Sequence, residues 1–359
     1  MLFQLYGSTA MTQLLGWVLV FAGLVILNEI GRRTKIGGIV LFVIIPAVLT
    51  IYFITIQAGL FGGHSNQTYE YMNGWFHYAK LYAADIGVVG FLMIKYKWGI
   101  GKKEWFKPWP FVIVAINILI AVVSDFESAI RAYQITGDFS GAWWASNEGV
   151  FLYGGWWNIV NGIAGLINIF CMTGWWGIYS SKKKDDMLWP DMTIWFIVAY
   201  DIWNFEYTYC NLPTHTWYCG VALLLAPTFA NALWNKGGWI QNRAMTLATW
   251  CMFAQVLPLF QLSNTFSVLP SLYGVKALDL YNAAITCHTT GASAGDAIAN
   301  FGITANPTAQ GVVAMLAIIA NVVCISVIIK RSIEQKKCPY TKEIWVGTRD
   351  YEQAMSRAE

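Results

Sequence analysis

Three aspartates lie inside stretches of the chain that are apolar and long enough to cross a membrane: Asp85, Asp125 and Asp201. A carboxylate is costly in lipid, so such residues face the inside of a helix bundle and usually serve a function. Carboxylates that lie close together repel one another, and one of them takes up a proton to relieve the repulsion. The sequence therefore predicts a ligand-binding or proton-coupling site at these residues, without identifying a catalytic residue.

Further polar residues share helix faces with these aspartates. In the stretch YDIWNFEYTYC, Asn204 and Thr208 follow Asp201 at i+3 and i+7, and Glu206 lies in the same stretch. Similar stripes run along three other segments: Tyr78 and Tyr82 with Asp85; Asn117, Ser124 and Ser128 with Asp125; and Asn158, Asn161, Gly165 and Asn168. We expect the four helices to turn these faces toward each other around a polar cavity. Alternatively, the asparagines only link helices, for about 0.6 kcal/mol each.

Aromatic residues and one arginine complete the candidate site. The 19 Trp and 18 Tyr exceed the needs of a helix bundle, although belts at the membrane interface account for many of them. Aromatic residues near the outer acids are candidates to stack on a ring or a cation: Trp203, Tyr207, Trp156 and Trp157. Glu127 and Arg131 have the i, i+4 spacing of an ion pair, and Arg131 is alternatively a binding group for a substrate carboxylate.

The elements that position these residues are membrane-spanning helices. With 57% hydrophobic and 12% charged residues, the chain is far more apolar than a soluble domain. Nine segments have the roughly 20 apolar residues that a spanning helix needs: about 11–30, 38–61, 76–96, 109–131, 157–179, 189–209, 214–234, 244–263 and 309–330. We predict an all-α transmembrane bundle that forms one domain over 1–330, followed by a short charged cytoplasmic tail at 331–359.

The basic residues set the orientation of this bundle. With the N-terminus outside, 20 of the 23 Lys and Arg residues fall in inner segments, leaving Lys80, Arg131 and Lys276 outside. Positive charge is retained in the cytoplasm during insertion, so the C-terminus is predicted to be cytoplasmic. In this topology the polar cavity opens outward. Asp85 lies midway through its span, and Glu206 lies near the outer surface.

Two features of the outer segments remain open at the level of sequence. The segment 264–308 is too apolar for a plain loop and forms either a re-entrant hairpin or a cap over the outer face. Cys210 and Cys219 end successive helices on the same side, so they are either a disulfide pair or two small buried residues.

The sequence lacks the motifs that are typical of several classes of protein. The sequence has no Cys/His cluster at metal-ligand spacing, no Gly-rich phosphate loop and no GxSxG or HExxH motif, so we predict neither a metal nor a cofactor. Nothing indicates a nucleic acid partner. The leading hypothesis is a transporter that binds a small polar, cationic or amphipathic solute.

Two alternatives to transport stay open. One is a membrane-embedded acid/base enzyme that acts on a lipid-like or isoprenoid substrate through Asp85, Asp125 and Asp201. The other is a non-catalytic subunit of a larger complex. The expected partners are therefore the lipid bilayer and an unidentified small molecule, and the sequence leaves open whether the chain forms a homo-oligomer or joins a complex.

Several short motifs resemble one family. They are MLFQLYGS at the start, MLWPDM at 187–192, YDIWNFEYTYCNLP, WYCGVALLLAPT at 217–228, WCMFAQ at 250–255 and CPYTKE in the tail. Together they resemble a family of bacterial multi-spanning membrane proteins classed only as a domain of unknown function. The resemblance covers nearly the whole chain and implies a bacterial cytoplasmic membrane and a single undivided domain. It implies no activity or site residue.

Overall fold

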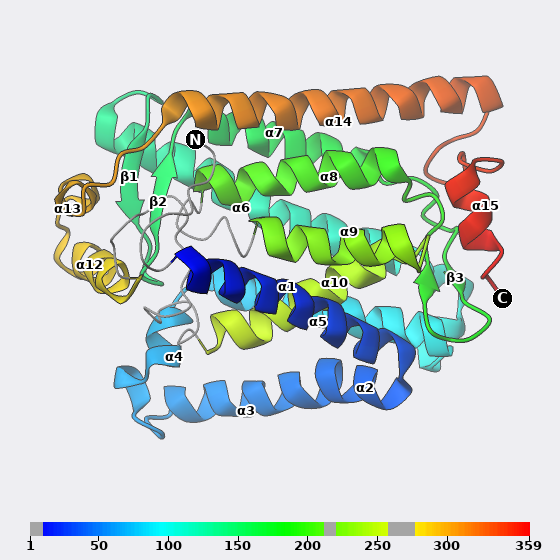
Figure 1. The fold of residues 1–359 in the computed structure, drawn as a ribbon, viewed down its shortest axis with the longest axis horizontal. Helices are drawn as coiled ribbons and strands as arrows, with labels where there is room; N and C mark the ends of the chain where they lie inside the picture. The colour runs from blue at the N-terminus through cyan, green and yellow to red at the C-terminus, as the bar shows by residue number, and fades with distance from the viewer. Residues whose placement is uncertain (1–9, 212–219, 258–276) are drawn as a thin grey trace.

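The computed structural model describes residues 10–211, 220–257 and 277–359, and these residues are mostly helical. The main helices lie along the long axis of the molecule (Figure 1). They are α1 (Ala10–Arg33), α2 (Lys35–Ile39) with α3 (Ile45–Gln57), α5 (Trp75–Tyr96), α6 (Trp109–Thr136), α7 (Trp156–Phe170), α8 (Ile194–Glu206), α9 (Leu223–Leu233), α10 (Trp239–Trp250) and α14 (Pro307–Gln335).

Four helical stretches of the described chain are long and apolar enough to cross a membrane: 14–33, 35–57, 104–136 and 307–335. The prediction of a helical membrane protein is confirmed to this extent. Helices α7 to α10 are shorter than their predicted spans, with 15, 13, 11 and 12 residues. Helix α7 ends at Phe170 rather than near 179 because the chain turns at Gly174, whose φ of 61° is left-handed.

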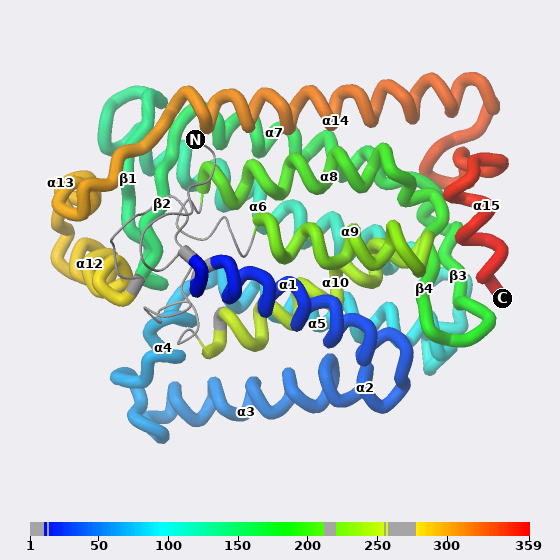
Figure 2. The backbone as a smooth tube through the Cα atoms, in the orientation of Figure 1, coloured from blue at the N-terminus to red at the C-terminus, as the bar shows by residue number. Residues whose placement is uncertain are grey.

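π-helical segments interrupt or extend these helices at η1 (Val40–Ile44), η5 (Tyr207–Asn211) and η7 (Cys251–Gln255), and residues 220–222 before α9 are also π-helical. The tube in Figure 2 follows the chain from α2 through η1 into α3. Segment η5 continues α8, and η7 continues α10 beside α5. A π segment widens the helix by one residue per turn and is frequent at functional sites. The widening changes which side chains face the bundle interior at these places.

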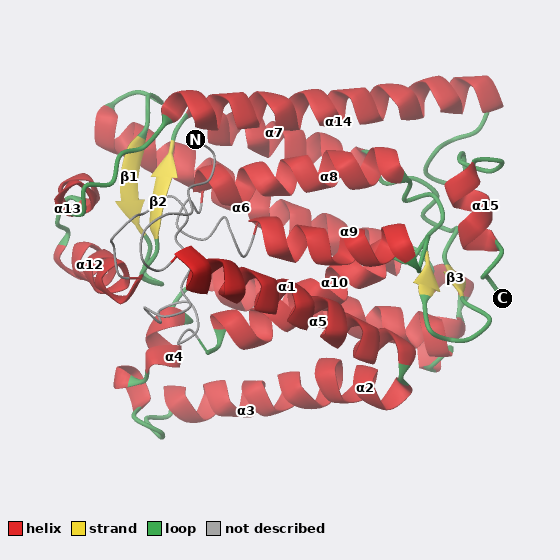
Figure 3. Ribbon diagram, in the orientation of Figure 1, coloured by secondary structure: helices red, strands yellow, loops and turns green. Residues whose placement is uncertain are grey.

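The strands lie at the two ends of the bundle (Figure 3). At one end, which we call the hairpin end, β1 (Ala142–Ala145) pairs with β2 (Phe151–Gly154) in an antiparallel hairpin. Helices α12 (Ala277–Thr290) and α13 (Ala294–Asn300) pack beside the hairpin, with the short α4 (Gln67–Tyr71) and η2 (Gly63–Ser65) nearby. Of the predicted segment 264–308, residues 277–308 form a cap at this end, and 264–276 lie outside the described residues.

The other end, which we call the tail end, carries the short strands β3 (Tyr179–Ser180) and β4 (Met187–Leu188), together with α15 (Arg349–Met355). The 3-10 turns η3 (Gly99–Lys102) and η4 (Glu104–Phe106) join α5 to α6. The C-terminal tail packs against the bundle rather than extending freely, because its backbone pairs with the bundle's loops. The amide of Gly174 donates to Pro339 O at 2.8 Å, and that of Lys182 donates to Arg357 O at 2.9 Å.

The interior is packed mainly with large aromatic side chains. Trp157, Trp189, Trp203 and Trp239 are all at most 1% exposed. Cys210 is also fully buried, and its thiol lies 3.6 Å from Gln310 O. Its predicted partner Cys219 lies outside the described residues.

Candidate functional site

Helices α5, α6, α8 and α10 bring six charged side chains into the interior of the bundle. We call them the interior site: Lys80, Asp85, Asp125, Asp201, Glu206 and Arg243. Asp201 is partly buried, and the other five are at most 9% exposed. Lys80 lies within electrostatic reach of Asp125 and Arg243, Arg243 within reach of Asp201, and Asp125 within reach of Glu206. Asp85 is connected to this group through the thiol of Cys251, which lies within reach of Asp85, Lys80 and Arg243.

Both carboxyl oxygens of Asp125 accept hydrogen bonds from side chains of α7. Asn158 Nδ2 and Asn161 Nδ2 donate to its two oxygens at 3.1 and 2.9 Å, so the predicted polar stripe of α7 faces that of α6. Close packing of these helices explains the contact, because Gly165 lies directly against the side chains of Val122 and Trp203. The indole of Trp203 donates to Asn161 O at 3.2 Å.

Glu206 and Asp85 are the two acids of the interior site whose carboxyl oxygens accept no N–H or O–H hydrogen bond from the described residues. Each of these carboxylates is also buried. The thiol of Cys210, a weak donor, lies beside Glu206, and Asp125 lies within electrostatic reach of it. The Glu206 side chain is 0% exposed, because α8 continues into η5 and carries it inside the bundle. Its predicted depth in the membrane stays a prediction.

Asp201 and Arg243 form the other half of the interior site. Thr228 Oγ1 donates to Asp201 Oδ2 at 2.8 Å and accepts from Trp239 Nε1 at 2.9 Å. Arg243 donates to Asn204 Oδ1 at 3.4 Å, and its guanidinium lies 5.6 Å from the ring centre of Tyr200. Among the residues that the structure describes, its Nε and Nη1 have no acceptor and Asp201 Oδ1 has no donor. This half therefore offers unused donors and an unused acceptor.

The two cations were not predicted. Lys80 was expected outside, but its Nζ donates to Asn117 O at 2.8 Å and lies within electrostatic reach of Asp125 and Arg243. Arg243 was expected in an inner loop, but α10 begins at Trp239 and carries it into the bundle. For Lys80 a signal existed, because a lysine inside a predicted span is itself a candidate site residue.

Other predicted residues lie apart from the interior site. The hydroxyl of Tyr82 pairs with Thr50 Oγ1 at 2.9 Å on the α3 side of α5. Asn168 donates to Asn321 Oδ1 at 2.7 Å and joins α7 to α14, as the structural alternative for the asparagines predicts. Arg131 pairs with Glu127 at 3.9 Å toward the hairpin end of α6.

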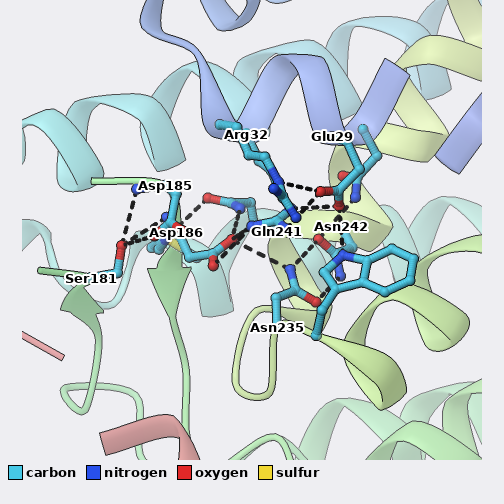
Figure 4. A network of polar contacts seen from close by, with 12 residues as sticks. Glu29, Arg32, Ser181, Asp185, Asp186, Asn235, Gln241 and Asn242 are labelled. Atoms are coloured by element: carbon cyan, nitrogen blue, oxygen red, sulfur yellow. Dashed lines mark hydrogen bonds and ion pairs between the residues drawn. The ribbon is translucent and has the colours of Figure 1, made fainter. Parts of the chain in front are cut away.

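A second buried charged cluster, absent from the sequence predictions, lies at the tail end (Figure 4). Its centre is Asp186, which is 0% exposed. Both of its oxygens accept from Arg32 Nη1 at 3.1 Å, and Gln241 Nε2 donates at 2.9 Å. Arg357 of the tail donates to Asp186 Oδ2, and Asn235 Nδ2 lies 3.4 Å from Asp186 Oδ1. We call these five residues the Asp186 network.

Two carboxyls near the Asp186 network also hold the tail. Asp191 accepts from Thr173 Oγ1 at 3.0 Å and from the amide of Ile344 at 3.2 Å, and burial raises its pKa to about 7. Glu359 pairs with Lys184 and with Lys97, and these hydrogen bonds hold the pKa of its carboxyl at about 2. The tail is thereby fixed to the loops that join the helices.

The charged side chains of the interior site determine which ligands it can bind and whether it can exchange protons. In the described part of the chain it holds four carboxylic acids and two cations. An ionised carboxylate without a hydrogen bond is strongly disfavoured in a buried environment, so Asp85 and Glu206 need a proton, a cation or a polar ligand. The arrangement is suited to exchanging protons and to binding a polar solute.

Comparison with known proteins identifies a family and nothing more specific. Residues 7–357 match the family described as "Family of unknown function (DUF5692)". No curated protein and no solved structure matches the chain. Because the match covers nearly the whole sequence, as the motif resemblance indicated, the chain belongs to this family of unknown function, DUF5692.

Proposed function

We propose that the chain crosses a bacterial cytoplasmic membrane nine times, with the hairpin end outside and the tail end in the cytoplasm. Side chains on α1 and α3 support a lipid-facing surface: Ile26, Val48, Ile51 and Ile54 are each more than half exposed. The predicted inner basic segments end at the tail end, as the retention of positive charge in the cytoplasm requires. The shorter helices α7 to α10 run alongside the longer ones (Figure 1).

We propose further that the protein is a proton-coupled transporter of a small polar or cationic solute. One observation carries this proposal: within the described part of the chain, Asp85 and Glu206 are buried carboxylates that accept no N–H or O–H hydrogen bond, inside the same bundle as Lys80 and Arg243. A buried ion pair that serves only structure is saturated with hydrogen bonds. Buried carboxylic acids that lack hydrogen bonds inside a membrane bundle are typical of proton relays and substrate paths.

The two halves of the interior site suit two tasks. Asp125 lies within electrostatic reach of Glu206, so a low dielectric disfavours a full negative charge on both, and a proton on Glu206 would relieve the repulsion. On the other side, Arg243 keeps two nitrogens and Asp201 one oxygen without a partner. We assign proton exchange to the first half and solute binding to the second.

The test uses proteoliposomes that contain the purified protein and a pH-sensitive dye. Amino acids, polyamines and monosaccharides are added outside one at a time, and the internal pH is followed. We expect members of one solute class to acidify the lumen with the wild type and with the surface control Asp296→Asn. Glu206→Gln should remove this proton movement, because an amide cannot carry the exchanged proton.

Solute binding is measured separately by the shift in melting temperature of the detergent-solubilised protein. Asp201→Asn should weaken binding of the active class while Asp296→Asn leaves it unchanged. The proposal is overturned if no class moves protons, or if folded Glu206→Gln and Asp296→Asn proteins transport alike. Solute binding without any proton movement would point to the acid/base enzyme or to a binding subunit instead.

A further inference from the structure

Two adjoining clefts open at the hairpin end, away from the interior site. The smaller one has a volume of about 280 Å³, and its walls include Glu127 and Arg131 from α6 and Asn147. The larger one has a volume of about 780 Å³, and its walls include Trp143 and Tyr153 of the hairpin. Trp144 and His288 line both clefts, so the two spaces adjoin.

The smaller cleft presents one positive and one negative group side by side. Arg131 Nη2 and Glu127 Oε1 are 3.9 Å apart, which is longer than a hydrogen bond, and their side chains are 52% and 33% exposed. Most donors of the guanidinium and most lone pairs of the carboxylate are therefore available. The guanidinium also lies 5.8 Å from the ring centre of Trp144, whose buried indole N–H has no acceptor.

The larger cleft presents aromatic surface held in place by its neighbours. The rings of Trp143 and Tyr153 are paired across the hairpin with centroids 5.0 Å apart, and Tyr153 stacks on the fully buried Trp157 at 5.3 Å. Behind the hairpin, the apolar cluster around Phe151 and Leu280 joins it to α12 and α13. This wall is preorganised to contact a large apolar side chain.

We propose that these clefts bind a zwitterionic amino acid with a large apolar or aromatic side chain. Its carboxylate is held by Arg131 and its ammonium group by Glu127. Its side chain enters the larger cleft beside Trp143 and Tyr153. An amino acid carries its two charges one carbon apart, which matches the close spacing of Glu127 and Arg131. This site is separate from the interior site and does not depend on the proposed transport.

The experiment compares three ligands that differ by one charged group: L-phenylalanine, 3-phenylpropionate, which lacks the ammonium, and phenethylamine, which lacks the carboxylate. Binding to the purified full chain is measured by saturation-transfer NMR titration. We expect L-phenylalanine to bind at least tenfold more tightly than either analogue. Arg131→Gln should remove the preference over phenethylamine, and Glu127→Gln should remove the preference over 3-phenylpropionate.

The chain offers a matched control pair. Lys330 and Glu334 have the same i, i+4 spacing and the same 3.9 Å separation on α14, but they line neither cleft. Lys330→Gln and Glu334→Gln should leave all three affinities unchanged, and Arg131→Lys should keep part of the preference if Arg131→Gln fails to fold. Equal binding of the three ligands, or equal effects of Arg131→Gln and Lys330→Gln, would overturn the proposal.

Discussion

Asp186 at the tail end and Glu206 in the interior site are both carboxylates with 0% exposure, yet their surroundings are opposite. Asp186 accepts hydrogen bonds from two arginines and a glutamine, whereas no N–H or O–H group of the described residues donates to Glu206. Burying a charge costs free energy that only paired, hydrogen-bonded groups offset. The first arrangement therefore stabilises one structure, and the second leaves a group free to change its protonation or its ligand.

The two regions also differ in what they join. The Asp186 network links the end of α1 through Arg32, the start of α10 through Gln241, and the tail through Arg357. These segments are far apart in the sequence, so the network stabilises their relative positions. In the interior site the charged residues come from helices that already pack through apolar contacts, so the fold does not depend on pairing them.

The largest effect is expected from Asp186→Asn. This change leaves Arg32, which is 2% exposed, and Arg357 without the carboxylate between them, and breaking a buried pair of this kind costs about 3–5 kcal/mol. We expect a large drop in the melting temperature of the detergent-solubilised protein. The control is Asp185→Asn, because that neighbouring side chain is 26% exposed and should matter much less. Similar losses for the two variants would contradict the central role of Asp186.

Arg357→Gln is expected to have the next largest effect. Arg357 donates to Asp186 and to Lys236 O at 3.0 Å, and hydrogen bonds to charged groups contribute about 1.5–3 kcal/mol each. Arg32 still neutralises Asp186, so we expect about 2 kcal/mol of destabilisation. Because Arg357 also holds the tail, limited trypsin digestion should cleave near Lys336 and Lys337 faster than in the wild type. An unchanged cleavage rate would mean that the other tail contacts suffice.

A pH dependence is expected from Asp191, whose pKa is about 7 in the folded protein and about 4 in an unfolded chain. Between these values the folded state holds a proton that the unfolded state has released. The free energy of unfolding therefore falls as pH rises through this window, with a slope on the order of 1 kcal/mol per pH unit, and is constant above it. Melting temperatures at pH 5 and pH 7.5 test this. Asp191→Asn should reduce the difference, and Asp350→Asn should not.

Composition predicted the helical membrane class because it depends on sums over long segments. The helical class and the polar faces of α6 and α7 follow from periodicity, and Asn158 and Asn161 do meet Asp125. Helix ends depend instead on individual contacts. The chain turns after α7 because the amide of Gly174 pairs with Pro339, a residue from the other end of the sequence.

The sequence predicted the acidic residues of the interior site as candidate site residues, but not Lys80 and Arg243. A count of basic residues treats Arg243 as a loop residue, because only the observed start of α10 at Trp239 places it inside the bundle. The π segments η5 and η7 have no sequence signature, yet they turn Tyr207 and Cys251 toward the interior. The sequence did not predict the Asp186 network because its members come from four separate segments. In the sequence, each of these segments resembles an ordinary polar helix end.

The smallest change in stability is expected from Glu206→Gln, and it gives the sharpest contrast with Asp186→Asn. Both variants replace a fully buried carboxylate by the amide of the same size. At Glu206 no hydrogen bond is lost, and a group that is unfavourable in its charged form is replaced by a neutral one, so the change should be within about 1 kcal/mol and directed toward greater stability. The two melting temperatures should therefore move in opposite directions. If Glu206→Gln destabilises as strongly as Asp186→Asn, Glu206 has a structural partner and the distinction between the two regions fails.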